Sequence, residues 1–208
     1  DRYNCLLIFD ECTSGFRETF GGLHLKYGIN PDITILGKSL GNGYAITAVL
    51  GSSQVMESSQ STFISSTFFT ERIGFTAALA SLEEMERTQS WKIISEKGLN
   101  FKKRLRIIFE KYKLDIDISG MNALVSFSFK HPEQLAIKTY ITQEMLNEKF
   151  LTGNLFYPSI AHSDNDIDDF FNSLDKVVCR LSKIIISGES VKSHLKGPIC
   201  HSTFQRLN

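Results

Sequence analysis

The sequence has few cysteines, and they do not form a metal-binding or disulfide pattern. Only four of 208 residues are cysteine, at positions 5, 12, 179 and 200, and no two of them are spaced as in a CxxC motif. The five histidines, at positions 24, 131, 162, 194 and 201, are scattered without the spacing of metal ligands. We therefore expect reduced thiols, no disulfide framework and no metal site.

The sequence also lacks an excess of either charge and a long apolar run. Lysine and arginine together number 23, as do aspartate and glutamate. We interpret the basic run at 102–106 as a solvated helix face, so no nucleic-acid partner is predicted. No apolar stretch reaches the roughly 18 residues of a membrane span, and no signal peptide is recognisable. These features favour a cytoplasmic protein that does not insert in a membrane.

Two short apolar runs near the start each lead to an ionisable residue. The run at 5–9 ends at Asp10, and the run at 33–36 leads to Gly37 and Lys38. Both runs are typical of buried parallel strands, whose carboxyl ends face a ligand crevice. Gly37 lets a neighbouring group approach the backbone closely. We therefore expect a carboxylate and an amine to face one cavity.

This pair of groups suits pyridoxal phosphate (PLP) chemistry. A lysine amine forms a Schiff base with the cofactor aldehyde, and a carboxylate pairs with the pyridinium nitrogen. Two nucleotide-binding alternatives fit less well. Gly37-Lys38-Ser39 is similar to part of a P-loop, but Asp32 stands where that loop needs glycine. Gly41-Asn42-Gly43 lacks the third glycine of a dinucleotide fingerprint, because Ile46 occupies its position.

Four segments resemble consecutive signatures of the class III aminotransferases. They are DECTSGFR at 10–17, YGINPDI at 27–33, LGKSLGNGY at 36–44 and SSTF at 65–68. Their order and spacing make the resemblance specific, whereas one motif alone would be weak. It is strong over roughly residues 5 to 88 and is nearest to the glutamate-1-semialdehyde aminomutase-like branch.

The resemblance implies a role for four side chains. Asp10 would bind the pyridine nitrogen, and Lys38 would form the Schiff base. Thr67 would bind the cofactor phosphate across the interface of a homodimer with a shared active site. Cys12 stands where the family usually has valine, so it would pack on one face of the ring as a small apolar group.

The resemblance also implies the fold, which is α/β and of PLP-dependent transferase type I. Residues 1–88 would be the second half of the large domain, residues 89–190 an α+β C-terminal small domain with its linking helix, and residues 191–208 a loosely ordered tail. Apolar patterns predict strands at 5–9, 33–36, 45–50 and 123–129. They predict helices at 70–86, 90–113 and 132–150, and one after Ser163 that ends near Gly188.

These expectations lead to an aminotransferase that moves an amino group between a small-molecule amino donor and a carbonyl acceptor. The alternatives are an intramolecular aminomutase and a catalytically silent fragment or assembly partner. Family members are about twice as long, and the chain begins at Asp1 without a methionine. We therefore expect a truncated chain, lacking the upstream half that supplies most of the phosphate-binding cup.

Overall fold

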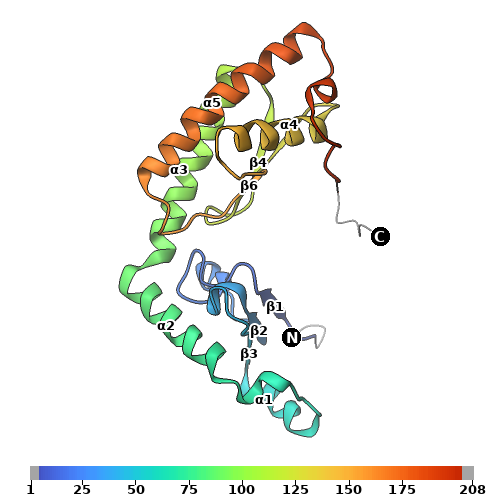
Figure 1. Cartoon of the computed structure of the whole chain (residues 1–208). Helices are drawn as coiled ribbons and strands as arrows, with labels where there is room; N and C mark the ends of the chain where they lie inside the picture. Colours follow the sequence, from blue (N-terminus) through green and yellow to red (C-terminus); the bar gives the residue numbers. More distant parts are fainter. Residues whose placement is uncertain (1–4, 203–208) are drawn as a thin grey trace. The chain divides into compact units, whose positions relative to one another are not determined.

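The computed structural model describes residues 5–202, which form two compact units. The first unit ends at Ser95 and the second begins at Glu96 (Figure 1). The division falls inside one long helix, α3 (Ser90–Lys111). The assignment of these units to the large and small domains of a transferase stays a prediction.

The first unit is built on a three-stranded mixed sheet. Its strands are β1 (Ile8–Glu11), β2 (Ile33–Leu36) and β3 (Ala48–Gly51), in the order β1-β2-β3. β1 pairs with β2 in parallel, and β3 pairs with β2 antiparallel. All three strands were predicted, but β1 and β3 begin three residues later than the apolar pattern suggested. The parallel pair is the element that positions the site, because it brings the ends of β1 and β2 to the same edge.

Helical segments complete the first unit. The longest is α2 (Arg72–Thr88), which confirms the helix predicted at 70–86. The Glu71 carboxylate caps α2 by accepting hydrogen bonds from the amides of Ile73 and Gly74, and Gln89 ends it in a left-handed conformation. The shorter segments are η1 (Leu23–Tyr27), η2 (Lys38–Leu40), α1 (Ser53–Met56), η3 (Glu57–Ser61) and η4 (Thr67–Thr70).

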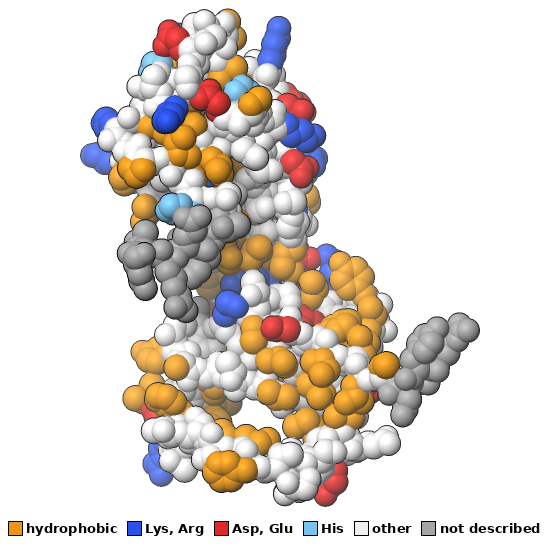
Figure 2. Space-filling view, turned by 90° about the vertical axis from the view of Figure 1, so that its right-hand side faces the viewer, with side chains coloured by type: hydrophobic (Ala, Val, Ile, Leu, Met, Phe, Trp, Pro, Cys, Tyr) orange, Lys and Arg blue, Asp and Glu red, His pale blue; other side chains and the backbone are white. Residues whose placement is uncertain are grey.

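The prediction that β1 is a buried strand is wrong for this chain. Ile8 is 52% exposed, because no other segment among residues 5–202 covers its side chain, and within these residues β1 pairs only with β2. The buried hydrophobic cluster of this unit is small and consists of Phe16, Leu36, Leu40 and Ala78. Figure 2 shows many apolar side chains at the surface of this unit. They include Leu6, Leu7, Val49, Leu50, Phe63, Ile64, Phe68, Phe69, Ile73, Phe75 and Leu79.

The second unit packs three helices against an antiparallel sheet. After α3 come β4 (Ile116–Ser119), β5 (Val125–Phe129), α4 (Gln134–Asn147), β6 (Leu155–Phe156), α5 (Asp164–Ser187) and η5 (Val191–His194). The sheet order is β4-β5-β6. β5 and the three long helices were predicted, whereas β4 and β6 were not.

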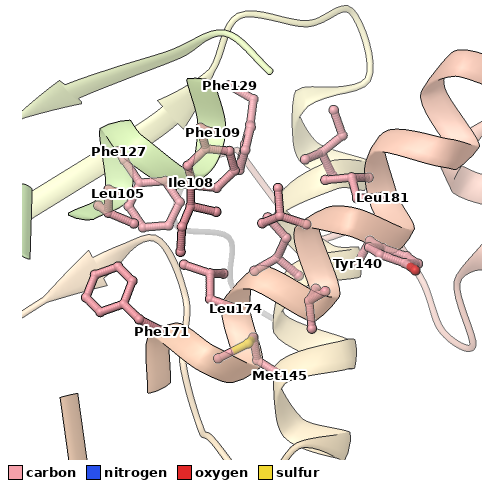
Figure 3. Close-up of a cluster of buried hydrophobic side chains, with 14 of the residues drawn as sticks. Leu105, Ile108, Phe109, Phe127, Phe129, Tyr140, Met145, Phe171, Leu174 and Leu181 are labelled. Atoms are coloured by element: carbon pink, nitrogen blue, oxygen red, sulfur yellow. The ribbon is translucent and has the colours of Figure 1, made fainter. Parts of the chain in front are cut away.

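The second unit has a closed core (Figure 3). The helix α5 places one apolar stripe in it, as its periodicity predicted, and Leu174 and Leu181 are 1% and 0% exposed. Leu105 and Phe109 of α3 meet this stripe, together with Met145 of α4. Ser163 and Asp166 form a capping box at the start of α5, and Gly188 ends it with a positive φ of 76°.

The segment after Ser190 is not loosely ordered where the structure describes it. Val191 is fully buried in the core of the second unit, and Leu195 and Ile199 pack against that core. The Cys200 amide also donates to Thr139 Oγ1 on α4 at 2.9 Å. The last six residues of the predicted tail lie outside the described residues. Within residues 5–202, no helix has both the length and the apolar character needed to cross a bilayer.

Candidate active site

The two residues singled out by the sequence lie at the same edge of the first sheet. Asp10 is the third residue of β1 and stands opposite Ile35 of β2. Lys38 follows two residues after the end of β2, as the first residue of η2. Since the two strands run in parallel, both chains leave the sheet on the same side. Parallel pairing therefore places the carboxylate and the amine in one neighbourhood.

Asp10 is exposed, and the loop that follows β1 holds its carboxylate. Oδ1 of Asp10 accepts a hydrogen bond from the Cys12 amide at 3.0 Å. Hydrogen bonds from Cys12, mainly from its amide, lower the pKa of Asp10, and the positive charge of Lys38 adds a smaller effect. The carboxylate is therefore charged at neutral pH.

Lys38 has an unusual backbone and a defined partner for its amine. Its φ of 40° lies in the left-handed region, which side-chain-bearing residues rarely adopt. Its Nζ donates to Thr13 Oγ1 at 2.7 Å. Sequence reasoning missed Thr13, although its place in the loop directly after β1 was a signal that it lies near the end of β2.

Cys12 and Gly37 come close together in the same region. A Cβ atom built on Gly37 would lie 3.3 Å from Cys12 Sγ and 3.3 Å from Thr47 Cγ2. A side chain larger than hydrogen would therefore crowd the loop after β1. A hydrogen bond to Asp10 raises the pKa of the Cys12 thiol, with burial and the charge of Asp10 adding to it. At neutral pH Cys12 is a small neutral group, as its predicted packing role requires.

A buried carboxylate anchors the loop between β1 and η1. Glu11 is only 3% exposed and accepts hydrogen bonds from Ser14 Oγ at 2.7 Å and Leu23 N at 2.6 Å. The amide and Nδ1 of His24 both lie 2.9 Å from the other carboxylate oxygen. Burial raises the pKa of Glu11, but these hydrogen bonds outweigh it and the net pKa is lowered. Glu11 is thus a charged clamp that fixes the segment carrying Cys12 and Thr13.

Lys38 lines a cavity of about 460 Å³ in the first unit. The other lining residues come from the loop that precedes β3 and from η4 and its neighbours in the sequence. Asp10 is not among the residues that line this cavity, and the expectation that the acid and the amine share one cavity stays a prediction. Ser66 and Phe68 line the cavity, whereas Thr67, which lies between them, does not. Thr67 is therefore adjacent in the sequence to two residues that line the Lys38 cavity, but it does not itself line this cavity.

No cluster of three or more histidine, cysteine or acidic side chains able to hold a metal ion occurs among residues 5–202. The polar groups near the edge of the sheet include the Asp10 carboxylate, the Lys38 amine and the Thr13 hydroxyl. This set can bind an aromatic cation and form a covalent bond to an aldehyde.

Comparison with known proteins relates the chain to one family. A family model described as aminotransferase class III matches residues 1–178. The 3-aminobutyryl-CoA aminotransferase of Cloacimonas acidaminovorans is 30% identical over 191 residues, which cover 89% of this chain and 46% of that protein. A glutamate-1-semialdehyde 2,1-aminomutase of Saccharolobus islandicus is 31% identical over 195 residues, covering 86% of this chain and 46% of that protein.

The fold agrees with this relationship. The FumI protein of Sphingopyxis sp. MTA144, solved in its PLP internal aldimine form, superposes with a TM-score of 0.83 at 21% identity. The superposition covers 90% of this chain and 46% of FumI. The α/β architecture thus matches about half of a fold-type-I transaminase, and the chain spans less than half the length of the relatives it matches. By the match of its sequence to the family model, the chain belongs to the class III aminotransferases.

Proposed function

We propose that this chain supplies the lysine and the aspartate of a PLP site used for amino-group transfer. The observation that carries the proposal is the parallel pairing of β1 with β2, which sets Asp10 and Lys38 at one edge of the sheet in a class III chain. The donor would be a small primary amine and the acceptor a small carbonyl compound. An intramolecular aminomutase is the second candidate, favoured by the 31% identity to the Saccharolobus islandicus protein.

The residues present fit the cofactor. The lowered pKa of Asp10 keeps a negative charge available for a protonated pyridine nitrogen. Lys38 is exposed, and its amine rests on a neutral hydroxyl. A Cβ atom at Gly37 would make a tight 3.3 Å contact with Cys12 Sγ, so glycine at this position lets the two strand ends lie close together. When bound, PLP supplies an electron sink for the bond that breaks at the substrate α-carbon.

Each residue would then have a separate task. Asp10 would orient the ring and hold the proton on the pyridine nitrogen. Lys38 would bind the cofactor covalently and, once displaced by the substrate amine, would move a proton through its free Nζ. Cys12 would pack against the ring. Thr67 would bind the phosphate of the cofactor held by a second protomer, so a homodimer is part of this proposal.

The exposed apolar surface of the first unit supports the proposal that another polypeptide segment covers its sheet. Parallel strands are normally covered on both faces, yet Ile8 of the parallel strand β1 is 52% exposed. Leu50 of the antiparallel strand β3 is 54% exposed as well. The chain also covers only 46% of its relatives. We therefore propose that the complete site forms when an upstream α/β segment of the class III type covers this sheet. A silent fragment or assembly partner is the alternative for the chain alone.

The test is covalent trapping of PLP. PLP is added to the purified chain, borohydride is added, and peptide mass spectrometry locates the pyridoxyl adduct. We expect selective modification of Lys38 and its loss in Lys38→Ala, with Lys26→Ala as a control that keeps the adduct. Diffuse labelling over many lysines, equal in wild type and Lys38→Ala, would refute a PLP site in this chain and leave the silent-partner alternative.

A further inference from the structure

We propose that Thr13 is a positioning residue that holds the Lys38 amine on a neutral hydroxyl and keeps it from pairing with Asp10. This proposal rests on the proposed function in one respect, because the proposed function gives Lys38 its reactive role. Thr13 Oγ1 lies 2.7 Å from Nζ of Lys38. Between Asp10 and Lys38 the structure records no ion pair, although residues 5–202 contain ion pairs elsewhere. The recorded partner of the amine is therefore a neutral hydroxyl, although the charge of Asp10 is near enough to interact with that of Lys38.

The choice of acceptor matters for both groups. A carboxylate within about 4–6 Å of an amine favours the charged, unreactive ammonium. It would also neutralise the negative charge that Asp10 must offer to a pyridine nitrogen. A hydroxyl can accept the hydrogen bond from Nζ without adding a charge. Lys38 then keeps a reactive amine, and Asp10 keeps its negative charge for the pyridine nitrogen. Thr13 thus separates a nucleophile from an acid that lies close enough for their charges to interact.

Other ionisable groups near Lys38 do not offer the same partner. Glu71 lines the same cavity, but its two oxygens accept hydrogen bonds from the amides of Ile73 and Gly74 at 2.7 and 3.1 Å. Cys12 is a neutral thiol at neutral pH, because a hydrogen bond to Asp10 raises its pKa. Asp10, whose charge interacts with that of Lys38, is therefore the carboxylate that we expect the amine to approach when the hydroxyl is removed.

The position of Thr13 is fixed by its own loop. The Nε of Arg17 donates to the carbonyl oxygen of Thr13 at 2.8 Å, and the Gly15 amide donates to the Glu11 carbonyl at 2.8 Å. The Glu11 carboxylate ties the same loop to η1. Lys38 is also constrained, because its backbone is in the left-handed region. Both ends of the hydrogen bond between Thr13 and Lys38 are thus set by the backbone before any ligand binds.

The test uses formaldehyde, a small aldehyde that needs no phosphate-binding cup. The full chain is methylated with formaldehyde and cyanoborohydride across a pH series, and peptide mass spectrometry gives the rate at Lys38. In Thr13→Val we expect the pH of half-maximal rate to rise by about one unit, because the amine then pairs with a carboxylate. Thr13→Ser should follow wild type. Thr76→Val, a matched change on the exposed face of α2, should do the same.

A double variant identifies the cause. Thr13→Val combined with Asp10→Asn should bring the profile back to that of wild type, because the competing carboxylate is gone. A Thr13→Val profile that overlays wild type, or a faster reaction at every pH, would overturn the proposal. If Thr13→Val unfolds the first unit, seen as a change in Trp91 fluorescence, Thr13→Ala removes the same hydroxyl with a smaller change. Because formaldehyde replaces PLP, failure of PLP trapping at Lys38 would refute the cofactor site without affecting this result.

Discussion

The Glu11 carboxylate offers the sharpest test of how the loop after β1 is held. Glu11→Gln keeps the size of the side chain and removes its charge. It also replaces one accepting oxygen by an NH₂ group that points at hydrogen-bond donors. Four donors surround the carboxylate, two at each oxygen, from Ser14, Leu23 and His24. In the glutamine variant, two of these donors lose their acceptor.

The expected loss follows from those two hydrogen bonds. A hydrogen bond to a charged group contributes about 1.5–3 kcal/mol, and a buried donor left without a partner carries a penalty of similar size. The Ser14 hydroxyl can turn to another acceptor, so the lower end of the range applies to it. We therefore expect Glu11→Gln to lower the free energy of unfolding of the first unit by about 3–4.5 kcal/mol at neutral pH.

Urea unfolding followed by Trp91 fluorescence measures this loss where it occurs. Trp91 is the one tryptophan of the chain, and its ring stacks on Phe20, at the end of the same loop, with centroids 5.1 Å apart. The pKa of Glu11 is lowered in the folded state, so its contribution is present above the unfolded value of about 4.3. It is lost as the pH falls through the lower folded value. The stability curves of variant and wild type should therefore converge in acid.

A matched control is Glu84→Gln, because the Glu84 carboxylate is exposed and pairs with Arg87 of the same helix. Its Trp91 transition should coincide with that of wild type. The reasoning fails if Glu11→Gln shifts the transition no more than Glu84→Gln does. It also fails if the difference between Glu11→Gln and wild type stays constant down to a pH well below 4.

Two further predictions concern the second unit. Leu174→Ala should lower the free energy of unfolding of this unit by about 2–5 kcal/mol, because the substitution leaves a cavity in a closed core. Leu151→Ala, at a side chain that is 90% exposed, should change the free energy of unfolding by less than about 0.5 kcal/mol. Urea unfolding followed by far-ultraviolet circular dichroism compares the two, and equal losses would contradict the prediction. Ser163→Ala should cost about 1 kcal/mol and speed amide exchange in the first turn of α5, because the cap on the Asp166 amide is lost; unchanged exchange there would show that the cap contributes nothing.

The local sequence pattern was sufficient to predict most of the helices and strands. It did not predict the shortest strands, and it did not predict that β1 is exposed. The stripe of α5 and its Ser163 cap predicted both the helix and the face it buries. The strand β4 has four residues and directly follows a helix and its turn, so its Ile-Asp-Ile-Ser alternation was too short to stand out. Burial of β1 failed for another reason: an apolar pattern shows that a strand suits a covered position, but the cover must come from other segments.

The site was predictable to the extent that it depends on strand ends. Asp10 and Lys38 could be placed together because parallel strands share an edge. The Thr13 hydroxyl and the clamp around Glu11 could not, because they depend on how a loop folds back. Leu23 lies 12 residues from Glu11, and Lys38 lies 25 residues from Thr13, and no local pattern relates residues so far apart. The burial of Val191 was likewise hidden by the polar residues around it.

The contrast between the open sheet of the first unit and the closed core of the second has a consequence for the lifetime of the chain in a cell. Proteases and chaperones act on segments that open locally, and an uncovered sheet edge opens at low cost. We therefore expect a protease to cut the first unit, which has few buried side chains, before it cuts the second. Binding of a covering segment at β1 would slow the turnover of the whole chain, which couples the abundance of this polypeptide to that of whatever covers it.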